Sequence, residues 1–353
     1  MRLDKLETPA LMLDMDTFDR NMSVMKDYME SAGLALRPHY KSHKSTAIAH
    51  MQIVSGAKGI TCAKLSEAED LIFSGIDDVL IANQIVGSYK LARVAYLAGC
   101  CHLTVCVDNV DNICDLEAAA AAQGTIIYCL VEYEIGMNRC GVDTPEAFFA
   151  LAGEIDRSPN LVFGGIQAYA GNLSHEEDCE IRRSASEKVE ARLSELRCFV
   201  EQKGLHIKEI SGASTGTVEF HTKNSAYTEI QAGSYIFMDA AYNALHLKFQ
   251  NALFVAATVM SANGSNVILD AGRKSISIDQ KMPALRDYPQ VPIKVSEEHS
   301  AISTENLQAS IGEKFLLIPG HCCTTVNLHD HIYLVRQGRV IDRISVDSRG
   351  KSV

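Results

Sequence analysis

The chain has 353 residues, 47% of them hydrophobic and 22% charged, and its 44 acidic and 33 basic residues give a net charge of −11. This composition predicts a globular protein of one large or two smaller domains, and the acidic balance disfavours nucleic acid or an anionic membrane as a partner. No apolar stretch approaches the roughly 18 residues that a membrane span requires. Eleven cysteines without a C-x-x-C pair, and no signal-peptide pattern, favour reduced thiols in the cytoplasm.

Short apolar runs alternate with helical patterns from residue 10 to about residue 245, which is typical of repeated β-α units. We predict eight strands, at residues 10–14, 34–39, 59–63, 78–83, 103–108, 125–132, 161–169 and 206–212. This number of strands predicts an α/β fold, a (β/α)₈ barrel of the TIM type. The alternative is a doubly wound open sheet, but no G-x-G-x-x-G follows the first strand.

The pattern changes after residue 245. Runs such as ALFVAATVMS, NVILDAG and KFLLIPG are short, β-branched and separated by Gly, Asn or Pro. They predict an all-β C-terminal domain. We therefore expect a barrel over residues 15–245 and a β domain over residues 246–353 that also includes residues 1–14.

Lys41 lies in the segment RPHYKSHK, at the predicted carboxyl end of strand 34–39. In a TIM-type barrel this end faces the active site. The nearby charges of Arg37 and Lys44, and partial desolvation, favour a neutral, nucleophilic amine that can form a Schiff base. A solvated basic loop is the alternative.

Two loops rich in Gly, Ser and Thr follow late strands, at residues 211–217 and 231–235. Their backbone N–H groups and hydroxyls can approach an anion closely, and late strands of such barrels often build a phosphate site. Ordinary turns are the alternative. A third loop, residues 136–141, carries Arg139, for which a surface salt bridge is equally compatible.

The segment PGHCCTT contains His321 and Cys323, separated by one residue. On an extended strand these two side chains would share a face, whereas Cys322 would point away. Imidazole and thiolate together suit Zn²⁺, and a site with only two protein ligands leaves positions for water and substrate. The alternative is a buried histidine beside inert thiols.

Together, these segments resemble a known family. RPHYKSHK, GMNRCGV, GIQAYAG, SGASTGT, EIQAGSYIFMD and PGHCCTTVNLHD are similar, in this order, to motifs of the fold-type III, alanine-racemase-like pyridoxal-phosphate enzymes. The branch is that of D-serine dehydratase, D-threo-3-hydroxyaspartate dehydratase and D-threonine aldolase. The match spans nearly the whole chain.

The resemblance implies that Lys41 carries pyridoxal phosphate through its amine, with Arg139 near the phenolic oxygen and Tyr169 against the pyridine ring. Gln231 falls where the racemases carry an arginine that faces the ring nitrogen, so that cation is missing here. The remaining implied cofactor contacts are Gln167 and, around the phosphate, Thr215, Gly216, Thr217, Gly233, Ser234 and the hydroxyl of Tyr235.

The resemblance also implies a divalent metal on His321 and Cys323, Zn²⁺ rather than Mn²⁺ because of the thiolate. Aldolases of this branch tend to show His-x-Asp and dehydratases His-x-Cys, so the pattern here favours dehydration. The racemases have no such metal site, and they use a catalytic tyrosine from the second domain for which we find no counterpart.

The main interpretation is therefore a pyridoxal-phosphate- and metal-dependent lyase that dehydrates D-serine or D-threo-3-hydroxyaspartate to a 2-oxo acid and ammonia. The alternative is a D-threonine or 3-hydroxy-D-aspartate aldolase that yields glycine and an aldehyde, and a remote one is a non-catalytic pyridoxal-phosphate-binding protein. Candidates for binding a distal substrate carboxylate are Arg37, His175 and Arg273. We expect a cytoplasmic homodimer with a small-molecule D-amino acid as its substrate, and no nucleic-acid or membrane partner.

Overall fold

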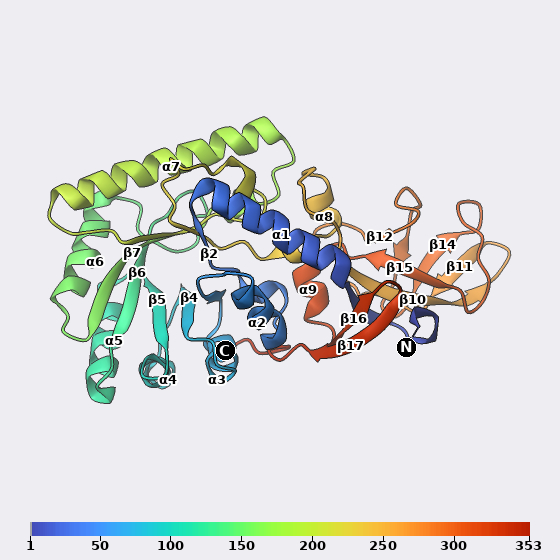
Figure 1. Cartoon of the computed structure of the whole chain (residues 1–353), viewed down its shortest axis with the longest axis horizontal. Coiled ribbons are helices and arrows are strands. Elements are labelled where there is room, and N and C mark those ends of the chain that lie inside the picture. Colours follow the sequence, from blue (N-terminus) through green and yellow to red (C-terminus); the bar gives the residue numbers. More distant parts are fainter. Residues whose placement is uncertain (1) are drawn as a thin grey trace. The chain divides into compact units, whose positions relative to one another are not determined.

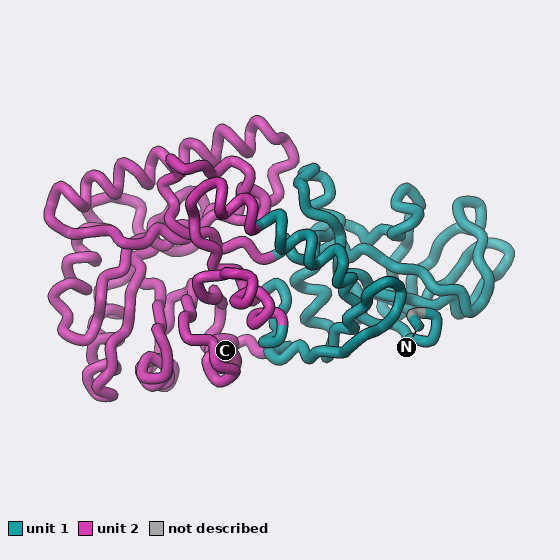
Figure 2. The backbone as a smooth tube through the Cα atoms, in the orientation of Figure 1, with its two compact units in different colours: residues 1–25, 42–47, 234–350 teal, residues 26–41, 48–233, 351–353 magenta. Residues whose placement is uncertain are grey.

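A computed structural model describes residues 2–353 of the chain. It divides into two compact units (Figure 2). Unit 1 comprises residues 1–25, 42–47 and 234–350, and unit 2 comprises residues 26–41, 48–233 and 351–353.

Eight parallel strands form the sheet of unit 2, in the order β2-β9-β8-β7-β6-β5-β4-β3. The strands are β2 (Ala35–Leu36), β3 (Ile60–Cys62), β4 (Asp78–Gln84), β5 (His102–Val107), β6 (Ile127–Glu132), β7 (Leu161–Ala168), β8 (Glu209–Gly212) and β9 (Glu229–Ile230). A parallel bridge between His39 and Thr61 connects the two ends of the sheet, which curls into a TIM-like barrel (Figure 1). The predicted fold class is thus confirmed.

Helices follow the strands along the chain. They are α2 (Thr46–Val54), α3 (Leu65–Phe73), α4 (Ser88–Ala98), α5 (Val110–Gln123), α6 (Pro145–Arg157) and α7 (Cys179–Gln202). Helices α3 to α6 pack as successive neighbours beside their strands (Figure 1). Side-chain caps fix where several of them begin: Asn109, Thr144 and Asp178 each accept a hydrogen bond from a backbone N–H in the first turn.

Strands β3, β5 and β6 are buried at nearly every position, and hence on both faces, which is why their sequences are nearly continuous apolar runs rather than alternating patterns. Leu80, Cys106 and Leu130, from three adjacent strands, pack together in the core. Gly165 in β7 has a φ of +144°, and a Cβ there would lie 1.9 Å from the carbonyl oxygen of Glu209 in β8. Only glycine permits this close approach of the two strands.

Unit 1 contains a mostly antiparallel sheet with the path β13-β14-β11-β10-β1-β16-β17, to which β15 and β12 add beside β10. The strands are β1 (Ala10–Asp14), β10 (Leu253–Ala262), β11 (Asn266–Leu269), β12 (Ala284–Leu285), β13 (Lys294–Val295), β14 (Ser300–Ser303), β15 (Lys314–Ile318), β16 (His331–Arg336) and β17 (Arg339–Ser345). Its core includes Leu6, Met12, Phe254 and Leu316. The predicted C-terminal β domain is thus confirmed.

One barrel strand was assigned wrongly. Residues 10–14 form a strand, as predicted, but β1 pairs with β10 and β16 in the sheet of unit 1. The eighth barrel strand is β9, which pairs with β2 and β8. Two residues are too short to produce a periodic pattern, so β9 left no signal in the sequence.

Helices α8 (Ala240–Asn243) and α9 (Cys322–Val326) lie in unit 1, whereas α1 (Met15–Ala32) and α2 begin in unit 1 and end in unit 2. Helix α1 begins in unit 1, and its residues from 26 onward belong to unit 2. The limits of the compact units therefore differ from the domain bounds that we predicted at residues 15 and 245. Those domain bounds stay a prediction. Among the helices of residues 2–353, none has the length and apolar character needed to cross a bilayer.

Candidate cofactor and metal sites

A cavity of about 170 Å³ lies in unit 2 where the barrel strands end. Its lining residues lie at the carboxyl ends of six different strands or just after them, as expected for the carboxyl-terminal mouth of a barrel. They are His39, Lys41, Ala63, Ala82, Asn83, Arg139, Cys140, Gln167, Tyr169 and Gln231. Five of the predicted cofactor-binding residues, Lys41 included, therefore line one cavity.

Lys41 lies just beyond β2, in a short 3₁₀ turn (Tyr40–Ser42). Its backbone N–H donates to Nδ1 of His39 at 3.3 Å, and its ammonium lies 5.1 Å from the centroid of the Tyr169 ring. Arg37 does not add an uncompensated charge here, because its buried guanidinium pairs with Asp78 at 2.6 Å and Glu229 at 2.8 Å. The same pairing removes Arg37 as a candidate for binding a substrate carboxylate.

Arg139 follows β6, and its guanidinium lies 5.6 Å from the Tyr169 ring centroid. Glu132, the last residue of β6, lies 3.7 Å from the Arg139 guanidinium and accepts a hydrogen bond from Gln84 at 2.6 Å. Burial raises the pKa of the Glu132 carboxyl, against the opposing effects of Gln84 and Arg139. The guanidinium of Arg139 thus lies between a carboxylate, that of Glu132, and the face of the Tyr169 ring at the cavity.

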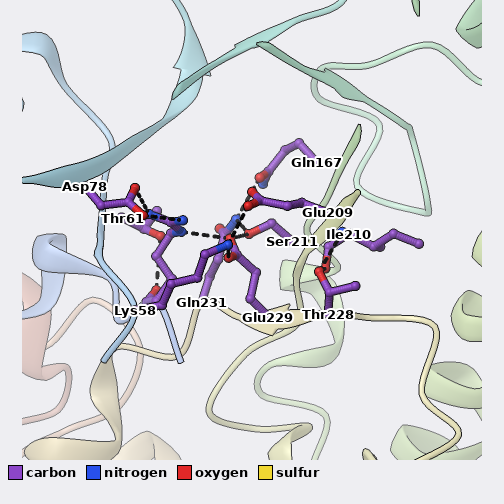
Figure 3. A network of polar contacts seen from close by, with 11 residues as sticks. Lys58, Thr61, Asp78, Gln167, Glu209, Ile210, Ser211, Thr228, Glu229 and Gln231 are labelled. Atoms are coloured by element: carbon purple, nitrogen blue, oxygen red, sulfur yellow. Dashed lines mark hydrogen bonds and ion pairs between the residues drawn. The ribbon is translucent and has the colours of Figure 1, made fainter. Parts of the chain in front are cut away.

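Gln167 and Gln231 lie side by side at the ends of β7 and β9 (Figure 3). The amide nitrogen of Gln231 donates to Oε1 of Gln167 and to Oγ of Ser211, both at 2.7 Å. Both glutamines are almost fully buried and line the cavity.

The first Gly/Ser/Thr loop follows β8, and Ala213 there has a left-handed φ of +56°. The buried hydroxyl of Thr215 has no hydrogen-bond partner among the described residues 2–353. A Cβ at Gly216 would lie 2.2 Å from the carbonyl oxygen of Ser174, so only glycine fits. Thr217 is buried, and its hydroxyl lies 3.3 Å from Nε2 of His221.

The second loop runs from unit 2 into unit 1 after Gly233, which is buried. In unit 1, the hydroxyl of Ser234 lies 3.8 Å from the sulfur of Cys323. The hydroxyl of Tyr235 donates to the sulfur of Met22 at 3.4 Å, and its ring packs against Phe249. Tyr235 is fully buried.

His321 and Cys323 lie at the start of helix α9 in unit 1. The expectation of an extended strand is wrong here: His321 is the N-cap residue, with extended backbone, and Cys323 lies in the first turn of the helix. Cys322 has surroundings of its own. Cys322 is fully buried, and its N–H donates to Asp239 at 2.8 Å.

Electrostatics favour Cys323 as the thiolate of this adjacent pair. The hydrogen bond from Cys322 and the proximity of His321 lower the pKa of Cys323 well below its ordinary value, against burial, whereas the pKa of Cys322 is raised. Burial alone would lower the pKa of His321, but Cys323 and Asp279 raise it to about 9. The thiolate is the form of cysteine that binds metals.

Asp279 supports the imidazole of His321. Its Oδ2 accepts a hydrogen bond from Nδ1 of His321 at 2.9 Å, which leaves Nε2 as the nitrogen available to a metal. The hydroxyls of Ser277 and Thr324 in turn donate to Asp279. Asp279 is 42 residues from His321, and no sequence pattern connected the two.

The residues present fit both groups that the resemblance implies. A buried hydroxyl without a partner and a glycine with no room for a Cβ match the needs of a phosphate, and a lysine beside an aromatic ring in a cavity matches those of an aldehyde cofactor. An imidazole and a thiolate match a borderline-soft metal ion. Among residues 2–353, no group of three or more His, Cys, Asp or Glu residues is arranged to hold a metal. A metal on His321 and Cys323 alone would have two of the four ligands that Zn²⁺ usually takes.

Comparison with known proteins identifies the family. The model of the alanine racemase N-terminal domain matches residues 13–241, and that of a putative serine dehydratase domain matches residues 252–335. The chain belongs to the fold-type III, alanine-racemase-like family of pyridoxal-phosphate enzymes. The resemblance noted from the sequence is thus confirmed.

Among relatives in this family, the chain is 38% identical to a 3-hydroxy-D-aspartate aldolase of Paracoccus denitrificans, over 98% of this chain and 93% of the relative. It is 39% identical to a D-threonine aldolase of an Arthrobacter species, over 99% and 94%. Identity to a D-threo-3-hydroxyaspartate dehydratase of a Delftia species is 27%, over 91% and 92%.

The solved structure of a D-threonine aldolase from Filomicrobium marinum superposes with a TM-score of 0.97, at 38% identity, over 100% of this chain and 98% of that one. The family member described here is therefore a lyase of the group that acts on D-hydroxy amino acids. These findings favour the aldolase alternative over dehydration, the main interpretation of the sequence.

Proposed function

We propose that the chain is an aldolase, dependent on pyridoxal phosphate and a divalent metal, that cleaves a D-β-hydroxy amino acid such as D-threonine or 3-hydroxy-D-aspartate into glycine and an aldehyde. The observation that carries the proposal is the contrast in similarity among relatives. Aldolases of these substrates share 37–39% of residues over 98% or more of the chain, whereas the dehydratases of Delftia and Dictyostelium share 27% and 24%.

In this proposal, Lys41 holds the cofactor through its amine. Arg139 lies at the phenolic oxygen, Tyr169 against the ring, and Gln231 at the ring nitrogen, beside Gln167. The phosphate is held by Thr215, Gly216, Thr217, Gly233 and Ser234, with Tyr235 beside them. When bound, pyridoxal phosphate takes up the electron pair that the broken bond leaves on the substrate α-carbon.

Aldol cleavage breaks the Cα–Cβ bond, so the β-hydroxyl must lose a proton and the α-carbon must gain one. In its protonated form, the amine of Lys41 would deliver the proton that the α-carbon gains, and the proton of the β-hydroxyl would be lost to solvent. The contacts of the Lys41 backbone with His39 and of its ammonium with the Tyr169 ring restrict where this amine can lie.

His321 and Cys323 hold the metal, for which we propose Zn²⁺ because a thiolate favours it over Mn²⁺. When bound, such an ion acts as a Lewis acid on the β-hydroxyl and favours loss of its proton. Asp279 fixes the imidazole so that Nε2 is presented for coordination.

Dehydration is the second candidate, and His321-x-Cys323 is the observation that favours it. In that reaction the same α-carbon loses its proton and the bond to the β-oxygen breaks. The two reactions share cofactor and metal. They differ in the Cα–Cβ bond, which breaks in aldol cleavage and stays intact in dehydration.

Product analysis with D-threonine tests the proposal. Aldol cleavage yields acetaldehyde and glycine, and we expect these from the wild-type enzyme and neither from Lys41→Ala. Formation of 2-oxobutanoate and ammonia instead would establish dehydration. Absence of both sets of products with each of D-threonine, D-serine and 3-hydroxy-D-aspartate, while the cofactor stays bound, would favour a non-catalytic carrier.

The proposed substrate is a small D-amino acid, and His175 and Arg273 stay candidates for a distal carboxylate. A homodimer and a cytoplasmic location also stay predictions. Chromatography with light scattering would test the first.

A further inference from the structure

Hydrogen bonds lead from the buried carboxylate of Glu229 through Ser211 to Gln231, which lines the cavity (Figure 3). Arg37 and Lys58 donate to Glu229 at 2.8 and 2.9 Å, and Ser211 donates to the same carboxylate at 2.6 Å. Gln231 donates to Ser211 at 2.7 Å. All of these residues lie in unit 2, so this geometry is internal to the barrel.

The charge of Glu229 sets the direction of each of these hydrogen bonds. Burial opposes ionisation, but Arg37 and Lys58 hold the pKa of Glu229 below its ordinary value, so the group is a carboxylate and can only accept. Ser211 has one proton and donates it to Glu229. Its oxygen must therefore accept from Gln231, which requires the amide nitrogen, not the carbonyl oxygen, to face Ser211.

The orientation of Gln231 follows from this direction. Its amide nitrogen bonds to both Ser211 and Gln167, so both N–H groups are used. Its carbonyl oxygen accepts no hydrogen bond within residues 2–353, and it is not among the fully buried polar atoms that lack a partner. Because Gln231 lines the cavity, this oxygen is the group it offers there.

We propose that Gln231 offers a hydrogen-bond acceptor to the ring nitrogen of pyridoxal phosphate, and that Glu229, acting through Ser211, is the positioning residue that fixes this orientation. The inference rests on the proposed function, in which Gln231 faces the ring nitrogen. An acceptor at this position stabilises a protonated ring nitrogen. A protonated ring is the stronger sink for electrons from the substrate.

The test uses holoenzyme reconstituted with pyridoxal phosphate labelled with ¹⁵N in the ring, and measures the ¹⁵N chemical shift. We expect the shift of a protonated pyridine in the wild type and in Gln231→Glu, which keeps an acceptor. Ser211→Ala removes the group that orients the amide, and Gln231→Leu removes the acceptor. Both variants should move the shift toward the unprotonated value.

Thr61→Val is the matched control. The buried hydroxyl of Thr61 lies in the same region and donates to the backbone carbonyl of Arg37 at 3.0 Å. It takes no part in the hydrogen bonds that connect Glu229 to Gln231. We expect its ¹⁵N shift to equal that of the wild type. Ser211→Ala leaves Arg37 and Glu229 paired, so it is preferable to Glu229→Gln, which can fail to fold.

A wild-type shift in the unprotonated range would overturn the inference. So would a protonated shift that is unchanged in both Ser211→Ala and Gln231→Leu. Borohydride reduction of the same samples distinguishes failure of the inference from failure of the proposed function. Cofactor that is fixed on Lys41 but has an unprotonated ring refutes only the inference. Cofactor that cannot be fixed on Lys41 refutes the proposed function.

Discussion

The ammonium of Lys41 lies 5.1 Å from the centroid of the Tyr169 ring, and the guanidinium of Arg139 lies 5.6 Å from the same centroid. One aromatic ring therefore contacts both cations that the proposed function assigns to the cofactor. Tyr169 follows β7, Lys41 follows β2 and Arg139 follows β6. The ring thus joins side chains from three separate strand ends at the cavity.

Removal of this ring should weaken cofactor binding. Loss of a cation–π and packing contact of about 1 kcal/mol predicts that Tyr169→Ala raises the Kd for pyridoxal phosphate roughly fivefold or more, whereas Tyr169→Phe keeps the ring face and changes it little. Titration of the apoenzyme, followed by absorbance, measures this. Tyr89→Ala is the control, because Tyr89 also lies beside an arginine, Arg93, but on the exposed face of α4. Equal Kd values for Tyr169→Ala and Tyr89→Ala would contradict the assignment.

Stability should depend strongly on Arg37. Its side chain and that of Glu229 are each 1% exposed, so Arg37→Leu leaves a buried carboxylate with only Lys58 and Ser211. Breaking a buried ion pair on one side costs about 3–5 kcal/mol of unfolding free energy. The matched control is Arg157→Leu, an exposed pair with Glu154 for which about 1 kcal/mol or less is expected. Urea unfolding of the two variants compares them, and similar losses would refute the role of Arg37.

Acid should destabilise the barrel through Glu190. Burial alone would raise the pKa of Glu190, but hydrogen bonds from His221, Ala226 and Ser225 lower it below the ordinary value. A carboxyl whose pKa is lower in the folded state contributes its full stability above the unfolded pKa of about 4.3 and loses it as the pH falls through the folded value.

Glu190→Gln should therefore lower the thermal midpoint at pH 7, and its deficit relative to the wild type should shrink as the pH falls below about 4.3. Thermal unfolding of both proteins across this pH range gives the comparison. A deficit that is constant with pH would show that Glu190 contributes packing only.

Metal affinity should depend on Asp279. Loss of a carboxylate that orients a metal-binding histidine typically lowers metal affinity about 10–100-fold. We therefore expect the Kd for the metal to rise by about this factor in Asp279→Asn. The thiolate absorbance of a Co²⁺-substituted enzyme reports binding without any turnover. Asp287→Asn, which changes an exposed aspartate paired with Arg286 in the same unit, should bind like the wild type. An unchanged Co²⁺ affinity in Asp279→Asn would exclude this role.

Local patterns explain which parts of this structure the sequence could predict. The long apolar runs of β4 to β7 are local signals, and they predicted the barrel. Strand β1 has the same local pattern but pairs in the other sheet, and only tertiary contacts decide that.

The site follows the same rule. Lys41, His321 and Cys323 were recognised from their neighbours in the chain. Asp279 and Glu229 were not, because each acts on a residue more than 20 positions away, His321 in one case and Arg37 in the other. The helical start of α9 was also missed, since the Gly-His-Cys-Cys segment lacks a standard N-cap side chain.

The central claim is that Lys41, at the mouth of the barrel, carries the cofactor. Borohydride reduction of the holoenzyme followed by peptide mapping tests it directly, and Lys44, three residues further along the same segment, provides an internal comparison. We predict a single pyridoxyl-modified peptide with the label on Lys41. A label on Lys44 or on any other lysine, or no label while bound cofactor is present, would contradict the account.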